Sequence, residues 1–227
     1  MGRFFVIGLG PGDPELITVK AVKALEASEV VFVPQSKRKE QSLAWEICQH
    51  WIDKARLKII HFAMKPQGPD QEGYRTLAQE IKDLLAQGKT ISYVTIGDPA
   101  IYSTAIYLCQ ELKKYQIKIN YIPGISAFNA GAALLGRALC EKGENLGLYE
   151  MPDEPHLASE RIRRHTTTIF MKVNQRVSVL LEAIRATSPE EAFLLQRIGL
   201  PGEKVYDLLS LSEPLKKAYL SLAIIRR

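Results

Sequence analysis

The chain has 227 residues, of which 46% are hydrophobic and 24% charged, and its formal net charge is +5. This length suits one large domain or two small ones, and the composition is ordinary for a globular protein. There is no apolar run of about eighteen residues and no signal-peptide layout, so we expect no membrane association and a cytoplasmic location. The positive charges are scattered, which argues against a nucleic-acid partner.

The cysteines and histidines form no metal-binding pattern. Cys48, Cys109 and Cys140 are far apart, none belongs to a CxxC pair, and each stands in a helix-like context. We expect them to be small buried hydrophobic residues in a reducing compartment. The four histidines also lack ligand spacing, so we expect no metal site.

The first half of the chain alternates strand and helix patterns. The expected strands are residues 3–8, 29–34, 57–62 and 90–96, and the expected helices are residues 13–28, 42–55, 74–88 and 99–115. This alternation predicts an α/β domain with a mainly parallel sheet.

The second half changes character, because its last two expected strands follow each other without a helix. The expected strands are residues 117–123, 145–151, 166–173, 191–198, 202–209 and 218–227, and the expected helices are residues 125–136, 155–165 and 174–186. Consecutive strands favour antiparallel pairing, so we expect a second α/β domain with a mixed sheet. We place the boundary near residues 113–118, which gives domains 1–114 and 115–227.

The glycine-rich segment "GLGPGDPE" at residues 8–15 follows the first strand but is not a dinucleotide-binding fingerprint. Asp13 stands where the third glycine of that motif belongs, and Pro11 lacks a backbone N–H. Asp13 and Glu15 would also repel a phosphate. A tight turn in which Asp13 caps the next helix is an alternative to a ligand-binding loop.

Two further loops and a strand end share this position after a strand: "TIGDPAIYS" at 95–103, "IPGISAFNAG" at 122–131 and "IFMKVN" at 169–174. In open α/β proteins, ligands bind at the carboxyl ends of strands. Gly97 permits close backbone approach, Asp98 offers an acceptor, Ser126 a hydroxyl and Met171 a soft apolar surface. The combination favours a neutral nucleoside that carries an amino acid over a nucleotide phosphate.

These segments resemble the tetrapyrrole methylase family of S-adenosylmethionine-dependent methyltransferases. The resemblance rests on "VIGLGPGDPELITVKA", "GDPAIYS", "IPGISAFNA" and "IFMKV", and it covers essentially the whole chain. It implies two α/β domains with an active-site cleft between them, S-adenosyl-L-methionine as the cofactor with S-adenosyl-L-homocysteine as its product, a small-molecule tetrapyrrole substrate, and a homodimer. "VVFVPQS" and "FMKVNQ" resemble the branch that methylates carbon 20 of precorrin-2 or cobalt-factor II in cobalamin biosynthesis.

The resemblance also implies roles for individual residues. It places the cofactor against Pro11, Ile96, Gly97, Asp98, Ile101, Ser126, Ala127 and Met171. Asp98 is the candidate base, although orienting the cofactor is the role we favour for it. The substrate candidates are Gly10, Gly12, Asp13, Lys37, Arg38 and Tyr102; the lysine and arginine match a polycarboxylate, and a solvated loop is their alternative.

Two other functions stay open at this point. One is a tetrapyrrole methylase that acts on another corrin-ring carbon or on uroporphyrinogen III. The other is a non-catalytic tetrapyrrole- or nucleoside-binding protein, which would keep the binding loops without an aligned methyl donor.

Overall fold

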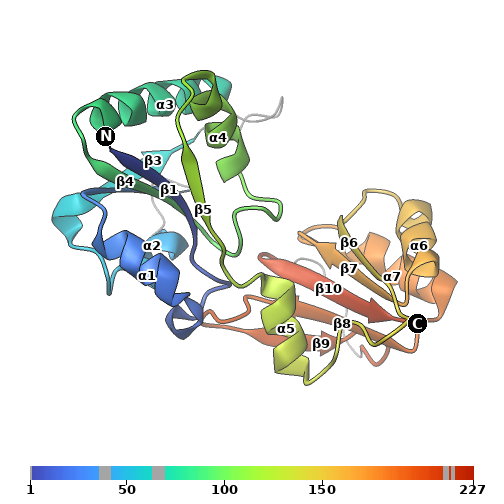
Figure 1. The fold of residues 1–227 in the computed structure, drawn as a ribbon. Coiled ribbons are helices and arrows are strands. Elements are labelled where there is room, and N and C mark those ends of the chain that lie inside the picture. Colours follow the sequence, from blue (N-terminus) through green and yellow to red (C-terminus); the bar gives the residue numbers. More distant parts are fainter. Residues whose placement is uncertain (1, 36–41, 63–69, 212–214, 216–217) are drawn as a thin grey trace. The chain divides into compact units, whose positions relative to one another are not determined.

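The protein folds into two compact units, Met1–Ser126 and Ala127–Arg227, each with its own five-stranded sheet (Figure 1). The computed structural model describes residues 2–35, 42–62, 70–211, 215 and 218–227. The two-sheet α/β architecture confirms the fold class expected from the sequence.

The sheet of the first unit is parallel throughout. Its strand order is β3-β2-β4-β1-β5. The strands are β1 (Arg3–Gly8), β2 (Val30–Gln35), β3 (Leu57–His61), β4 (Thr90–Thr95) and β5 (Ile119–Ile122). Because every strand runs the same way, the loops that follow these strands leave from one edge of the sheet.

Helices cover both faces of this sheet, as βαβ crossovers require. The helices are α1 (Val19–Glu26), α2 (Leu43–Cys48), α3 (Gln71–Ala86) and α4 (Ala105–Lys114), with the short 3-10 turns η1 (Pro14–Leu16) and η2 (Lys54–Arg56). Successive residues of a strand point to opposite faces of the sheet, so they pack into two different hydrophobic cores. Phe4 and Phe32 pack with α3 and α4, whereas Ile7, Val31 and Val33 pack with α1 and α2.

Three helices of the first unit are shorter than the sequence patterns suggested. Helix α1 begins at Val19, although we expected it to begin at residue 13. Helix α2 ends at Cys48, although we expected it to reach residue 55. Helix α4 begins at Ala105, and residues 99–104, which we expected to be helical, form turns instead. The turn segment therefore belongs to the loop after β4.

The second sheet is mixed, as expected from the consecutive strands at the end of the chain. Its order is β6-β7-β10-β8-β9, with β10 antiparallel to both β7 and β8. The strands are β6 (Leu146–Glu150), β7 (Thr167–Met171), β8 (Glu191–Gln196), β9 (Lys204–Asp207) and β10 (Ser221–Arg226). It follows that β6, β7 and β8 run in one direction and end at the same edge.

Its two faces carry different helices. Helix α5 (Ala127–Leu135) lies on one face, where Leu222 and Ile224 of β10 point; α6 (Pro155–Arg164) and α7 (Val177–Thr187) lie on the other, with Ala223 and Ile225. The α5 side packs tightly, since a Cβ added to Gly131 would lie 3.0 Å from Leu195 Cδ2.

The expected boundary near residues 113–118 is wrong. Strand β5 pairs in parallel with β1, so the segment that we assigned to the second domain completes the first sheet. The compact units divide after Ser126 instead. A lone strand between two helices does not reveal from its sequence which sheet it will join, because its pairing partner is distant in the chain.

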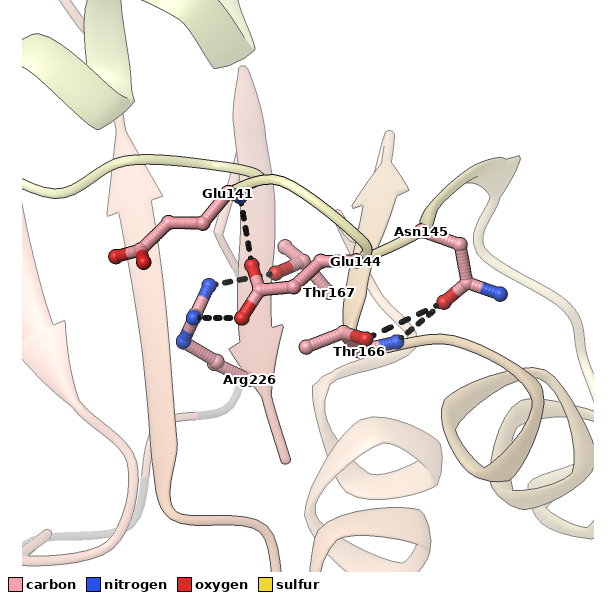
Figure 2. Close-up of polar contacts among 6 residues, drawn as sticks. All are labelled: Glu141, Glu144, Asn145, Thr166, Thr167 and Arg226. Carbon is pink, nitrogen blue, oxygen red and sulfur yellow. Dashed lines mark hydrogen bonds and ion pairs between the residues drawn. The ribbon is translucent and has the colours of Figure 1, made fainter.

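Polar side chains connect the last strand to the segment that precedes β6 (Figure 2). Arg226 of β10 donates to Glu144 Oε1, and Glu144 Oε2 accepts from the Glu141 backbone N at 2.8 Å. Beside them, Asn145 Oδ1 accepts from the Thr166 N at 2.8 Å. These contacts join the segment before β6 to β7 and β10.

The cysteine expectation holds for two residues of three. Cys48 and Cys109 are buried, but Cys140, which lies in the connection between α5 and β6, is exposed. Within the described ranges, no helix is long and apolar enough to span a bilayer. The same residues contain no cluster of three metal-ligating side chains.

Candidate functional site

Three loops meet at the carboxyl edge of the first sheet, each after a neighbouring strand. They follow β1, β4 and β5, which lie side by side in the order β4-β1-β5. The Gly10 N donates to the Gly97 O at 3.3 Å, and the Gly97 N donates to the Gly10 O at 2.6 Å. This reciprocal pair joins the first two loops at their glycines.

Gly8 and Gly124 allow the backbones of these loops to touch. A Cβ added to Gly8 would lie 2.6 Å from both the Gly97 carbonyl oxygen and the Gly124 nitrogen. A Cβ on Gly124 would collide with the same Gly97 carbonyl. Both positions require glycine for packing, so these two residues serve the framework of the site.

Gly97 differs, because its missing side chain would point into open space. Its φ is +73°, and no heavy atom of the described residues lies within 4 Å of an added Cβ. Its backbone conformation thus favours glycine, while the surface above it stays accessible to a ligand.

Asp98 ties the second loop to the third. Its Oδ1 atom accepts from the Ala100 N at 2.8 Å, and its Oδ2 atom accepts from the Gly124 N at 3.1 Å. Both carboxylate oxygens are therefore engaged within the protein. The role that this geometry supports is holding the loops in place, which differs from the direct contact to the cofactor expected from the sequence.

Hydroxyl groups add further links around the same edge. Thr95 and Ser103 share a hydrogen bond of 2.9 Å, and Ser103 Oγ accepts from the Ala105 N at 3.2 Å, at the start of α4. Thr18 Oγ1 donates to the Pro123 O at 3.4 Å. Together with Asp98, these contacts leave the three loops little freedom to move independently.

The structure of the first loop is compatible with both a capped tight turn and a ligand-binding loop. Asp13 Oδ1 accepts from the Glu15 N at 2.8 Å and caps the 3-10 turn η1, whereas Thr18 caps the following helix α1. Pro11 and Gly12 are buried, and Gly10 has a φ of +82°. Whether Gly10, Gly12 and Asp13 also meet a substrate stays a prediction.

The other predicted site residues of the first unit differ in how exposed they are. Ser126 is 7% exposed, Ile96 and Ile101 are half-buried, and Tyr102 is 42% exposed. Tyr102 has a φ of 47°, an unfavourable conformation for so large a residue. Lys37 and Arg38 lie outside the described residues.

In the second unit, Ala127 and Met171 pack against one hydrophobic cluster on the α5 face of the sheet. That cluster contains Ile169, Leu195 and Ile198. The structure therefore brings these two residues, which are far apart in the sequence, to the same part of their unit.

Behind the loops, Tyr93 on β4 is fully buried in the core under α3 and α4. Burial raises the pKa of its phenol well above the usual range. The phenol thus stays protonated, and Tyr93 is a core residue rather than a base.

The sequence reading missed four residues with left-handed backbone at one edge of the second sheet. They are Lys172 and Asn174 after β7, Arg197 after β8 and Leu220 before β10, with φ values of 56°, 43°, 55° and 52°. Such strain gathers at binding sites. None is a glycine, and only Asn174 is of a residue type that often adopts this conformation, so composition marks these positions weakly.

Comparison with known proteins decides the family. Residues 3–213 match the family described as tetrapyrrole (corrin/porphyrin) methylases. The chain belongs to this family. Its members are S-adenosylmethionine-dependent methylases, so the cofactor expected from the sequence is confirmed, and the chain is a tetrapyrrole methyltransferase.

Two relatives of the tetrapyrrole methylase differ in the ring carbon that their names give. A probable cobalt-precorrin-2 C(20)-methyltransferase of Methanocaldococcus jannaschii is 31% identical, over 99% of this chain and 96% of that protein. A cobalt-precorrin-4 C(11)-methyltransferase of the same organism is 29% identical, over 83% and 71% respectively.

A solved structure shows the same fold. The uroporphyrin-III C-methyltransferase of Thermus thermophilus, complexed with S-adenosylhomocysteine, has a TM-score of 0.68 to this chain. The alignment covers 100% of this chain and 98% of that one at 19% identity.

Proposed function

We propose that this methylase transfers a methyl group to carbon 20 of precorrin-2 or of its cobalt-loaded form, in corrin biosynthesis. The observation that carries the proposal is the near full-length match to a probable C(20)-methyltransferase. The match to a C(11)-methyltransferase is almost as identical but leaves more of both chains uncovered. A different ring carbon is therefore the second candidate.

The reaction is an in-line displacement at a sulfonium. A ring carbon attacks the methyl carbon, the sulfur–methyl bond breaks, and sulfur keeps the electron pair as S-adenosylhomocysteine forms. The electrophile is already activated, so the protein mainly supplies proximity and alignment. The ring carbon then loses a proton to a base that we leave unassigned, because both oxygens of Asp98 already accept backbone hydrogen bonds.

For the methyl donor, we propose that the first unit contributes the loops after β1, β4 and β5. The residues involved are Pro11, Ile96, Gly97, Asp98, Ile101 and Ser126, with Asp98 acting through Gly124. The open space above Gly97 and the fixed loop backbones support this assignment. We also propose that Ala127 and Met171 contact the methyl donor and that the protein forms a homodimer. Both of these proposals rest on the family resemblance.

The test is a product analysis with purified protein. We expect S-adenosylmethionine carrying a ¹³C methyl group to give a singly methylated product from precorrin-2 or its cobalt form, with the label at carbon 20 by NMR. Label at carbon 11 of a later intermediate, with precorrin-2 untouched, would select the second candidate. Binding of the tetrapyrrole without methyl transfer would support a non-catalytic protein instead.

A further inference from the structure

Arg197 has a strained backbone that the surrounding chain holds in place. Its φ is 55°, a left-handed conformation that is unfavourable for a residue with a long side chain. The Arg197 N donates to the Leu220 O at 2.9 Å, and the Arg197 O accepts from the Leu200 N at 2.9 Å. Leu220 is itself left-handed, so two strained residues support each other across the start of β10.

The side chain of Arg197 is also held. Its Nε atom donates to the Pro201 O at 2.7 Å. Beside it, Gly202 has a φ of +84°, and an added Cβ there would lie 3.6 Å from Arg197 Nε. The loop after β8 thus curls around the arginine and orients its guanidinium.

The outer atoms of this guanidinium are left for another partner. Arg197 Nη1 and Nη2 make no hydrogen bond or ion pair within the described part of the chain. In the same loop, Glu203 forms no ion pair with Arg197 within the described residues, and its Oε2 atom accepts from the Gly199 N at 2.7 Å. Four other arginines of this unit do pair with carboxylates: Arg137, Arg164, Arg176 and Arg226.

Arg197 lies at the same edge of the second sheet as Met171, which the family resemblance places against the cofactor. Strands β7 and β8 run in the same direction with β10 between them, so Arg197 and Met171 lie at the same edge of the sheet. At that edge, Lys172 pairs with Glu150 at 3.7 Å, so its charge is partly balanced. A planar guanidinium with two unengaged nitrogens matches a carboxylate in a two-point contact.

We propose that Arg197 binds a carboxylate of a ligand through its Nη atoms. The proposal rests on the proposed function, which offers two sources of that group: the methionine part of the methyl donor and the acid side chains of the tetrapyrrole.

The experiment separates these sources with Arg197→Gln in the full chain. Calorimetry gives the affinity for S-adenosylhomocysteine and for 5′-methylthioadenosine, which shares the adenosine and the sulfur but has no carboxylate. Steady-state kinetics at saturating donor give the KM for the tetrapyrrole. Arg163→Gln is the matched control. Like Arg197→Gln, it removes one positive charge and one side-chain hydrogen bond to a backbone carbonyl, here the 2.8 Å bond to the Ala186 O.

We expect Arg197→Gln to weaken the binding of one carboxylate ligand by about tenfold or more, and Arg163→Gln to bind that ligand about as well as the parent protein does. A loss for S-adenosylhomocysteine but not for 5′-methylthioadenosine identifies the donor carboxylate. A raised tetrapyrrole KM with unchanged S-adenosylhomocysteine affinity identifies the substrate. Equal losses for both nucleosides, or parental values throughout, would overturn the proposal.

Arg197→Lys keeps the test available if the glutamine variant does not fold. Lysine retains the charge but not the two-point geometry, so we expect a smaller loss that follows the same ligand. Should the parent transfer no methyl group to any tetrapyrrole, the proposed function fails, while the comparison of the two nucleosides still reports on Arg197.

Discussion

The carboxylate of Asp98 joins two loops through the Gly124 amide, which donates to its Oδ2 atom at 3.1 Å. The contact spans the gap between the loops after β4 and β5. It also holds Gly124 against the Gly97 carbonyl, where a side chain would not fit. Contacts within the first unit therefore hold these loops together.

We predict that Asp98→Asn destabilises the ligand-free protein as well as weakening cofactor binding. An amide presents only one acceptor oxygen, so either Gly124 or Ala100 loses its partner, at a cost of about 1–3 kcal/mol. Hydrogen exchange of the Gly124 amide and urea unfolding report the loss, and calorimetry with S-adenosylhomocysteine reports the affinity.

The matched control for this variant is Asp53→Asn. Asp53 makes the same local turn, with its Oδ1 atom accepting from the Ala55 N at 3.0 Å, but it lies at η2. We expect it to leave Gly124 exchange unchanged. Weaker binding by Asp98→Asn with parental exchange and stability would instead mean that Asp98 contacts the cofactor directly.

Gly97→Ala is expected to fold and to bind S-adenosylhomocysteine at least about tenfold more weakly. The new methyl group meets no described atom, so the fold bears only the left-handed strain of about 1–2 kcal/mol. The methyl group would instead occupy ligand space.

Gly88→Ala is the control for backbone strain, because Gly88 has a φ of +85° and open space around an added Cβ. Gly88 lies before β4, away from the loops that follow the strands. Similar unfolding midpoints for Gly88→Ala and Gly97→Ala, with weak binding in Gly97→Ala alone, would support the site. Parental affinity in Gly97→Ala would remove Gly97 from it.

A thiol-reactive dye should label Cys140 quickly and the other two cysteines only after unfolding. Cys140 is exposed, whereas burial raises the pKa of the Cys48 thiol to about 12 and also raises that of Cys109. A buried thiol with a raised pKa yields almost no reactive thiolate near neutral pH. Cys140→Ser should abolish the fast phase; a second fast thiol would show that a core opens readily.

Replacing Glu144 by glutamine should destabilise the second unit near neutral pH but not in acid. The hydrogen bond from the Glu141 backbone and the contact with Arg226 lower the pKa of the Glu144 carboxyl below its usual value of 4.5 (Figure 2). The folded-state pKa is depressed, so the stabilisation is present above the unfolded pKa and is lost as the pH falls through the folded pKa.

Urea unfolding of the parent and of Glu144→Gln at several pH values checks this expectation. The two curves should converge at the acidic end of the series. A constant difference across all pH values would assign the effect to packing rather than to charge.

The sequence by itself determined the succession of strands and helices, the parallel and mixed sheets and the glycines at the strand ends. Hydrophobic periodicity and turn chemistry are local properties, and they suffice for that level. Only the tertiary structure decided that β5 joins the first sheet, that Asp98 reaches Gly124 and that Cys140 is exposed. It also decided that Arg197 is held in a strained conformation beside β10. Each of these depends on partners distant in the chain, because strand pairing, loop contacts and burial follow from the packing of the whole unit.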